Sequence, residues 1–425
     1  MSQDGEPLVL FDAVVFDLDG TLVATERFWV EAARAGARTA FAELGLEREL
    51  PPAEAWLSMV GLPLERGFAL VFPDLDARQR AHLMARCVEE EEAALRAGGA
   101  ALMDGARELL DALATRGLRL GIASNCGRGY LETMLHGLGL ARWISEARCL
   151  DSAGVRDKAG MVADLLESFS TRSAVMVGDR RGDADAAHEN GLPHVHLEGV
   201  IKPRGEEVPC EARIGSLGEL GGVLSARARW IEGALRSIGA LGRAGEGLRV
   251  LGVTGAPAAG KTLFARDLAR VLERSGRPAR ALALDAWRRN GESEGGADPL
   301  ETYDLERLAA RLLEPHRAGR PVAAWDAGAV PLAPDELLVL EGPWLLHPRL
   351  RVHLERVIHL WVPAEVSTAR VAARAGWQRA TEALLELRRI RLPAQRAFER
   401  AFDPTARADL CLDGSNPLCG PPPAS

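Results

Sequence analysis

The chain has 425 residues, of which 47% are hydrophobic and 26% are charged, and its net charge is −8. This length and composition predict two to three domains with sizeable cores and are ordinary for a soluble protein. No apolar run reaches the roughly 18 residues that a membrane span needs. The first residues also lack the basic start of a signal peptide, so we expect a cytoplasmic protein with no membrane partner.

Strands and helices alternate in the first half of the sequence. Residues 8–16 form an apolar run that is typical of a buried strand. Three more strands are expected at 118–123, 174–177 and 194–197. Helices are expected at 106–116, 129–137 and 159–169. This alternation predicts an α/β domain whose parallel sheet is covered on both faces. Residues 24–98 interrupt the pattern with a stretch rich in helix formers.

Polar residues follow three of these strands. Asp17 and Asp19 lie in the sequence Asp-Leu-Asp-Gly-Thr directly after the first strand, whereas Ser124 and Asp179 follow two later ones. Because ligands bind at the carboxyl ends of parallel strands, we expect these residues to meet at one edge. Two carboxylates placed together can bind Mg²⁺, one of them can attack phosphorus, and the other can transfer protons.

Further residues complete this predicted phosphate site. Ser124 and Asn125 offer hydrogen-bond donors to phosphate oxygens, and Lys158 offers a compact positive charge. Asp179 and Asp183 supply additional oxygen ligands for a metal ion. A single such residue could be a turn or surface residue, but the ordered set favours a phosphate site.

These motifs resemble those of the haloacid dehalogenase-like phosphatases over about residues 8–200. The resemblance implies that Asp17 is the nucleophile, forming an aspartyl-phosphate, and that Asp19 is the general acid/base. It implies that phosphate is bound by a set of polar residues with Lys158, namely Thr21, Ser124 and Asn125. Mg²⁺ would be held by Asp17, the backbone carbonyl of Asp19, Asp179 and Asp183. The stretch 24–98 looks like the helical cap of the phosphoglycolate phosphatase-like branch.

A second α/β pattern begins near residue 248, so we expect domains at 1–215 and 248–420 joined by a linker with a helix at 216–247. The second domain is predicted to have strands at 248–253, 280–284, 337–340 and 357–362. Its helices are predicted at 261–275, 304–318, 365–375 and 381–400. The overall fold class is therefore two parallel-sheet, three-layer domains in tandem. The first is a Rossmann-like phosphatase core with an inserted cap.

A phosphate-binding loop lies between the first strand and first helix of the second domain. Its residues are Gly255, Ala256, Pro257, Ala258, Ala259, Gly260, Lys261 and Thr262. Glycines allow backbone N–H groups to approach phosphates, and the helix N-terminus adds positive potential. Lys261 is expected to reach the β- and γ-phosphates of ATP, and Thr262 to bind Mg²⁺.

Several charged residues favour a kinase. Asp285 ends a predicted strand, where it could act as a base toward an acceptor hydroxyl, and Glu341 ends another. Arg370 and Arg374 lie at i and i+4 of a helix, where they could clamp the transferred phosphate, although a solvated helix face remains an alternative. The arrangement is similar to the uridine kinase family over about 248–415, which implies a P-loop kinase fold with Glu341 as a second acidic group at the metal ion. Residues 324–328, however, lack the Tyr-Asp and nearby His of uridine kinases.

We therefore expect a bifunctional enzyme: a Mg²⁺-dependent phosphatase for a small phosphorylated metabolite and an ATP-dependent kinase for a small hydroxyl compound. The alternative is a polynucleotide 5′-kinase/3′-phosphatase, and a third possibility is a regulatory nucleotide sensor. Residues 1–225 carry a net charge of −13 and residues 226–425 a net charge of +5, and an acidic phosphatase half is a poor surface for nucleic acid. Of the 52 basic residues, only Lys158, Lys202 and Lys261 are lysine, and two of these lie in the motifs.

Overall fold

The computed structural model describes residues 8–199, 206–241, 247–289, 299–323 and 331–418. The chain divides into two compact units: the first unit comprises residues 11–224, and the second unit comprises residues 225–425 with the residues up to Leu10. The division falls inside the segment 216–247. None of the helices in the described ranges has the length and apolarity that crossing a bilayer requires.

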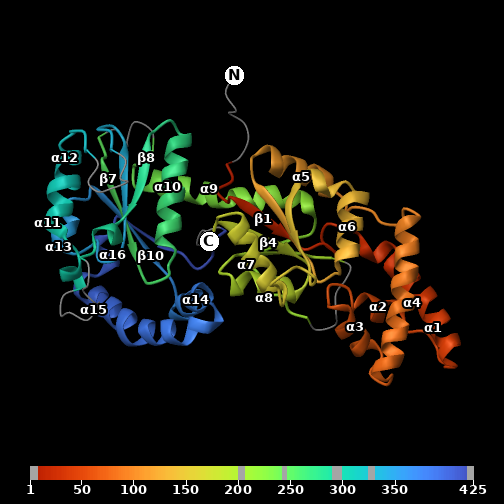
Figure 1. Cartoon of the computed structure of the whole chain (residues 1–425). Coiled ribbons are helices and arrows are strands. Elements are labelled where there is room, and N and C mark those ends of the chain that lie inside the picture. Colours follow the sequence, from red (N-terminus) through yellow and green to blue (C-terminus); the bar gives the residue numbers. More distant parts are fainter. Residues whose placement is uncertain (1–7, 200–205, 242–246, 290–298, 324–330, 419–425) are drawn as a thin grey trace. The chain divides into compact units, whose positions relative to one another are not determined.

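The first unit is built on one six-stranded parallel sheet with the order β3-β2-β1-β4-β5-β6 (Figure 1). Its strands are β1 (Ala13–Phe16), β2 (Arg119–Ala123), β3 (Ile144–Arg148), β4 (Ala174–Gly178), β5 (His194–Leu197) and β6 (Ala212–Ile214). The central strand β1 pairs with β2 on one side and with β4 on the other, in parallel register. The expected α/β fold with a parallel sheet is thus confirmed for this unit.

Helices connect these strands: α5 (Ala106–Thr115), α6 (Arg128–Gly137), α7 (Lys158–Ser168) and α8 (Arg181–Glu189). Apolar residues of α7 and α8 pack with Val15 and Met176 of the sheet into one core cluster. α5 and α6 lie on the other side of the sheet in Figure 1. The carboxyl ends of β1, β2 and β4 lie at the same edge of this parallel sheet, where the polar motifs occur.

A helical cap is inserted between β1 and α5 and consists of α1 (Trp29–Leu44), α2 (Ala53–Leu57), α3 (Leu64–Val71) and α4 (Ala77–Arg96). It has its own core, in which the fully buried Trp56 contacts the rings of Phe68 and Phe72. Asp76 and Gln79 form a reciprocal capping box that starts α4. A separate core allows the cap to keep its shape independently of the sheet below it.

The second unit contains a five-stranded parallel sheet with the order β11-β10-β7-β9-β8. Its strands are β7 (Val250–Gly255), β8 (Ala279–Ala283), β9 (Leu337–Glu341), β10 (Arg356–Trp361) and β11 (Leu410–Asp413). The central β7 lies between β9 and β10, and all pairings are parallel. This sheet also agrees with the expected α/β class.

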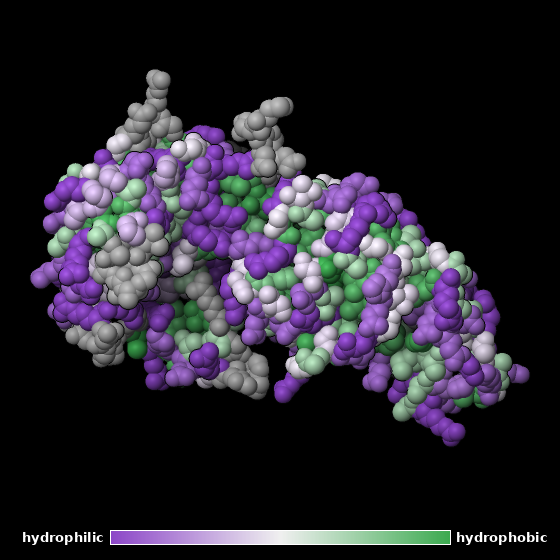
Figure 2. Space-filling model, turned by 45° about the horizontal axis from the view of Figure 1, so that its top comes forward, coloured by the Kyte–Doolittle hydropathy of each residue, from purple (hydrophilic) through white to green (hydrophobic). Residues whose placement is uncertain are grey.

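Helices cover both faces of the second sheet. They are α9 (Leu220–Ser237), α10 (Lys261–Arg274), α11 (Leu305–Leu308), α12 (Glu314–Arg317), α13 (Pro348–Arg351), α14 (Ala364–Glu386), α15 (Leu392–Phe402) and α16 (Pro404–Arg407). α10 and the second part of α9 pack on one face, whereas α11 and α13 pack on the other. Hydrophilic side chains prevail on the face of the molecule seen in Figure 2, with apolar residues in small groups between them.

The structure differs from the expected elements at several boundaries. The strand expected at 8–16 begins only at Ala13, because Leu8 and Leu10 pack into the core of the second unit. The edge strands β3 and β6 were not expected. The two helices expected within 365–400 are α14 and α15, which a π-helical turn at Leu387–Arg391 joins without a break.

Candidate active sites

The first candidate site lies where β1, β4, α7 and α8 converge. Asp17 follows β1, Lys158 is the first residue of α7, and Asp183 lies in the first turn of α8. The Lys158 Nζ donates hydrogen bonds to Asp17 Oδ1 at 2.7 Å and to Asp183 Oδ1 at 2.6 Å. All three side chains are buried, so one ammonium balances two carboxylates in an environment of low dielectric constant.

Three carboxylates of this cluster fit a divalent cation. Single oxygens of Asp17, Asp179 and Asp183 lie within 4.8 Å of one another. Oδ2 of Asp17 and Oδ2 of Asp179 are buried and have no hydrogen-bond partner among the described residues. Buried oxygens without partners are costly, and hard oxygen ligands are those that Mg²⁺ prefers. The residues present therefore suit Mg²⁺.

The pKa values of these carboxyls reflect the same crowding. Burial, and then the nearby Asp183, raise the pKa of Asp17 to about 7, while Lys158 acts in the opposite direction. Burial and the carboxylate of Asp17 also raise the pKa of Asp179. A cation among these groups would favour their ionised forms.

Gly178 explains how the carboxylates come so close. It is the last residue of β4, and a Cβ at this position would meet Asp183 Oδ2 at 2.3 Å. The same oxygen accepts a hydrogen bond from the Arg180 backbone N–H at 2.9 Å. Glycine is thus needed here for the close approach of α8 to the end of the strand.

Asp19 lies apart from the cluster of Asp17, Asp179 and Asp183 and lines the cavity. Its Oδ1 accepts hydrogen bonds from Thr25 Oγ1 at 2.7 Å and from the Tyr130 hydroxyl at 2.6 Å. Burial raises the pKa of Asp19, and the two hydroxyl donors oppose this effect. Sequence reasoning missed both donors, although Tyr130 is one of only two tyrosines in the chain.

The remaining expected phosphate-binding residues occupy the same edge of the sheet. Ser124 follows β2 and is buried, and its Oγ accepts a hydrogen bond from the Cys126 backbone N–H at 3.3 Å. The Asn125 amide donates to the Gly61 carbonyl of the cap at 2.9 Å. Thr21 Oγ1 donates to Asp179 Oδ1 at 3.4 Å. The structure therefore brings every site residue expected in the first half to one region.

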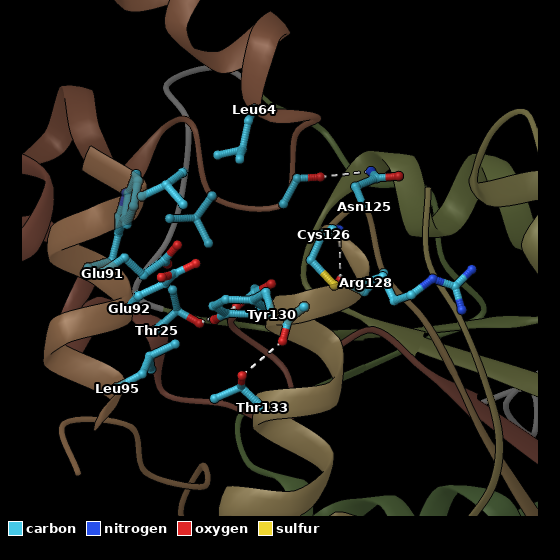
Figure 3. A pocket seen from close by; sticks show the side chains of 18 of the residues that line it. Thr25, Leu64, Glu91, Glu92, Leu95, Asn125, Cys126, Arg128, Tyr130 and Thr133 are labelled. Atoms are coloured by element: carbon cyan, nitrogen blue, oxygen red, sulfur yellow. Dashed lines mark hydrogen bonds between the residues drawn. The ribbon is translucent and has the colours of Figure 1, made fainter. Parts of the chain in front are cut away.

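A cavity of about 530 Å³ lies between the core and the cap (Figure 3). Asp19, Ser124 and Asn125 line its core side. The cap side is lined by apolar and acidic residues that sequence reasoning did not identify, including Trp29, Leu64, Glu91, Glu92 and Leu95. The cavity gives room for the part of a substrate that lies beyond its phosphate.

The second candidate site is the loop between β7 and α10. Gly255 has a φ of 148°, and a Cβ there would meet the Leu360 carbonyl oxygen at 1.9 Å. Gly260, with a φ of 92°, precedes α10 directly. The Lys261 Nζ donates to the carbonyl oxygens of Gly255 at 3.2 Å and Ala256 at 2.9 Å. The loop thus folds back over its own lysine at a helix N-terminus, a position suited to anions.

Other residues support this loop from neighbouring elements. Thr262 Oγ1 donates to Glu341 Oε1 at 2.8 Å, which joins α10 to the end of β9. Ser367 of α14 donates to the Pro257 carbonyl at 2.6 Å. Arg370 donates to the carbonyl oxygens of Ala258, Gly414 and Ser415. These contacts hold loop residues 257 and 258 against the first turns of α14, while Ala259 is itself buried.

Asp285 lies just after β8, where its carboxylate is largely exposed. It accepts a hydrogen bond from the Tyr303 hydroxyl at 3.0 Å and pairs with Arg288 at 3.4 Å. Sequence reasoning did not identify Tyr303, the second tyrosine of the chain. The side chain of Arg374, the segment 324–328 and Lys202 lie outside the described residues.

Comparisons with known proteins identify the first half. Residues 14–196 match the family described as haloacid dehalogenase-like hydrolase. A phosphoglycolate phosphatase of Rhodospirillum rubrum is 33% identical over 207 residues, which are 43% of this chain and 78% of that protein.

Solved structures are also similar to part of the chain. A predicted phosphoglycolate phosphatase from Haemophilus somnus 129PT is 17% identical, with a TM-score of 0.46, and the match covers 51% of this chain and 99% of that chain. CbbY from Rhodobacter sphaeroides, in complex with phosphate, is 20% identical with a TM-score of 0.43, over 50% of this chain and 96% of that chain. On the strength of the sequence relative, the resemblance seen in the first half is confirmed, and the chain belongs through this half to the haloacid dehalogenase-like hydrolases, as a phosphatase.

Proposed function

We propose that the chain is a bifunctional enzyme that removes a phosphoryl group in its first unit and transfers one from ATP in its second unit. The observation that carries the first activity is the buried cluster in which Lys158 bonds both Asp17 and Asp183 beside Asp179. Asp19, two residues after Asp17, lines the cavity between the core and the cap. The substrates are small molecules, a phosphomonoester in the first unit and a hydroxyl compound in the second.

The hydrolysis proceeds in two steps. An oxygen of Asp17 attacks phosphorus, the bond to the leaving oxygen breaks, and Asp19 donates a proton to that oxygen. Water then attacks the aspartyl-phosphate, Asp19 takes up the proton, and inorganic phosphate and the free carboxylate of Asp17 are released. Lys158 lowers the cost of negative charge on Asp17 and on the phosphoryl group. Mg²⁺ held by Asp17, Asp179 and Asp183 would screen repulsion between the carboxylates and phosphate.

The phosphatase proposal is tested with p-nitrophenyl phosphate and Mg²⁺. The wild-type chain is expected to hydrolyse this ester, and Asp17→Asn is expected to abolish the reaction because the neutral amide cannot serve as the nucleophile. Asp185→Asn is the matched control, since Asp185 is an exposed α8 residue whose contact is a surface pair with Arg181. Equal hydrolysis by the Asp17→Asn variant would refute the mechanism.

For the second unit, we infer ATP-dependent phosphorylation of a small hydroxyl compound. The loop around Lys261 and the Thr262–Glu341 hydrogen bond support binding of a nucleoside triphosphate with Mg²⁺. Asp285 would accept the proton of the acceptor hydroxyl as the γ-phosphoryl group leaves ATP. Arg370 and Arg374 of α14 would stabilise the transferred phosphoryl group.

The kinase proposal is tested by ADP release in the presence of Mg·ATP and a panel of nucleosides, sugars and other small alcohols, with 5′-hydroxyl oligonucleotides in parallel. ADP release with at least one small acceptor is expected, together with its loss in Lys261→Ala. Lys202→Ala, which removes the lysine outside both motifs, is the control. Activity that persists in Lys261→Ala would refute the role of the loop, and turnover of oligonucleotides alone would favour the polynucleotide alternative.

A further inference from the structure

The cap wall of the phosphatase cavity carries two carboxylates. Glu91 and Glu92 of α4 line the same cavity as Asp19 and Tyr130. Figure 3 shows both carboxylates directed into the cavity, on the side opposite Asn125 and Cys126. A substrate whose phosphate lies at Asp17 therefore places its remaining part near these two acidic side chains.

The acidic side chains that line the cavity are only partly balanced by basic ones. Glu92 pairs with Arg96 one turn away at 3.4 Å, and Asp151, which also lines the cavity, accepts a hydrogen bond from the Arg128 backbone N–H at 2.8 Å. Glu91, by contrast, makes no hydrogen bond or ion pair within the described part of the chain. Its side chain is half-buried, so solvent screens its charge less than that of a surface residue.

Neighbouring charges also act on Glu91. Burial, and then the carboxylates of Asp19 and Glu92, raise the pKa of Glu91 to about 8. The cavity thus resists further negative charge at this position, and a positive group placed there would be stabilised. Arg128, the other cavity-lining arginine, points away from the cavity in Figure 3, and its guanidinium donates to the Asp151 carbonyl.

Apolar side chains surround the acidic pair. Trp29 of α1, Leu64 of α3, and Val88 and Leu95 of α4 line the cavity on the cap side. Alkyl groups next to an ammonium can pack on such a wall, and an aromatic ring among them favours an organic cation. An apolar wall with a half-buried carboxylate is also a poor environment for a second carboxylate.

We propose that the phosphatase site takes phosphomonoesters of amino alcohols, whose ammonium group is bound next to Glu91, and disfavours esters whose leaving group carries a carboxylate. Glu91 is the specificity-determining residue of this site. The inference rests on the proposed phosphatase function, and it adds the chemical class of the leaving group. The reaction is hydrolysis of the phosphorus–oxygen bond, which gives the free amino alcohol and inorganic phosphate.

The test uses three esters of similar size whose leaving groups differ in charge: phosphoethanolamine, 2-hydroxyethyl phosphate and 2-phosphoglycolate. For the full chain with Mg²⁺, kcat/KM is expected to fall in this order. At least about a tenfold difference is expected between the first ester and the last, as for a single charge contact in a partly buried site. Equal values, a preference for 2-phosphoglycolate, or turnover of p-nitrophenyl phosphate with none of the three esters would overturn the proposal.

Two variants distinguish a direct contact between Glu91 and the ammonium group from the long-range effect of removing one negative charge from α4. Glu91→Gln keeps the size of the side chain and is expected to reduce the ratio of kcat/KM for phosphoethanolamine over 2-phosphoglycolate by about tenfold. Glu90→Gln removes the same charge from an exposed neighbour outside the cavity, and it is expected to leave the ratio unchanged. An unchanged ratio in Glu91→Gln would overturn the assignment. A wild-type chain inactive toward p-nitrophenyl phosphate would instead refute the phosphatase proposal itself.

Discussion

Replacing Lys158 by methionine is the sharpest test of the buried charge cluster. The Lys158 ammonium is 6% exposed and bonds two carboxylates that are 1% and 0% exposed. Methionine keeps the length of the side chain but leaves Asp17 and Asp183 without their shared cation, next to Asp179. Removal of one partner from a buried ion pair costs about 3–5 kcal/mol. A shared cation should place this site in the upper part of that range.

The loss is measurable by thermal or denaturant unfolding of the full chain without a metal ion. For a unit of this size, 1 kcal/mol corresponds to a shift of roughly 2–4 °C in the melting temperature, so the unfolding transition of the first unit should shift by more than about 6 °C. Hydrolysis of p-nitrophenyl phosphate should disappear, because the ionised form of Asp17 loses its neighbouring positive charge. Added Mg²⁺ should recover part of the stability and none of the activity.

A double variant distinguishes electrostatic cost from lost packing. Lys158→Met combined with Asp183→Asn removes the uncompensated carboxylate, and the new amide can still accept the hydrogen bond from the Arg180 backbone N–H. The double variant should therefore be more stable than Lys158→Met alone while remaining inactive. The reasoning fails if Lys158→Met stays within about 1 kcal/mol of the wild type, or if the double variant is the less stable of the two.

Three further changes test other parts of the first unit. Gly178→Ala should lower kcat for p-nitrophenyl phosphate by about 100-fold, because the new Cβ displaces the Asp183 carboxylate; a fully active variant would contradict the required close approach. Tyr130→Phe should raise the pKa of Asp19 and move the acidic limb of the kcat profile to higher pH, whereas an unchanged profile would argue against this role. Burial lowers the pKa of His194 to about 4, so the unfolded chain binds a proton near pH 6.5 that the folded chain does not. The free energy of unfolding, which is highest above pH 6.5 as far as His194 is concerned, should therefore fall by roughly 1.5 kcal/mol between pH 6.5 and 5. His194→Leu should make the free energy of unfolding depend less on pH. If the variant shows the same pH dependence as the wild type, His194 is not its cause.

Much of the fold follows from short-range patterns. The strand ends that carry Asp17, Ser124 and Asp179 were recognisable because an apolar run ends abruptly in polar residues, and the parallel sheet brings such ends to one edge. The edge strand β3 has no such signal, since Glu146 and Arg148 lie within it and it is only half-buried. Edge strands often carry charge, so the apolar pattern could not reveal it.

Contacts between the cap and the core were beyond the sequence pattern. Asn125 bonds the Gly61 carbonyl, and Glu91 lines the same cavity as Asp19, although these pairs are far apart in the chain. Nothing local distinguishes Glu91 from its acidic neighbours on α4, because only the closure of the cap decides which of them lines the cavity. Likewise, the apolar run 8–16 did not reveal that Leu10 belongs to a different core.

Lysine and tyrosine are rare in this chain, and the role of each such residue depends on the groups that it contacts. Lys158 bonds carboxylates, and with Asp17, Asp179 and Asp183 ionised its cluster carries a net negative charge, so binding of a phosphate dianion there should depend steeply on Mg²⁺. Lys261 instead donates to backbone carbonyls at the start of α10, where the helix N-terminus adds to its positive charge. The two tyrosines make comparable contacts. Tyr130 and Tyr303 each donate a hydrogen bond to the carboxylate that is proposed to transfer protons in its unit. In the first unit the Tyr130 hydroxyl favours the ionised form of Asp19, which is the form that takes up the proton of water in the second step of hydrolysis.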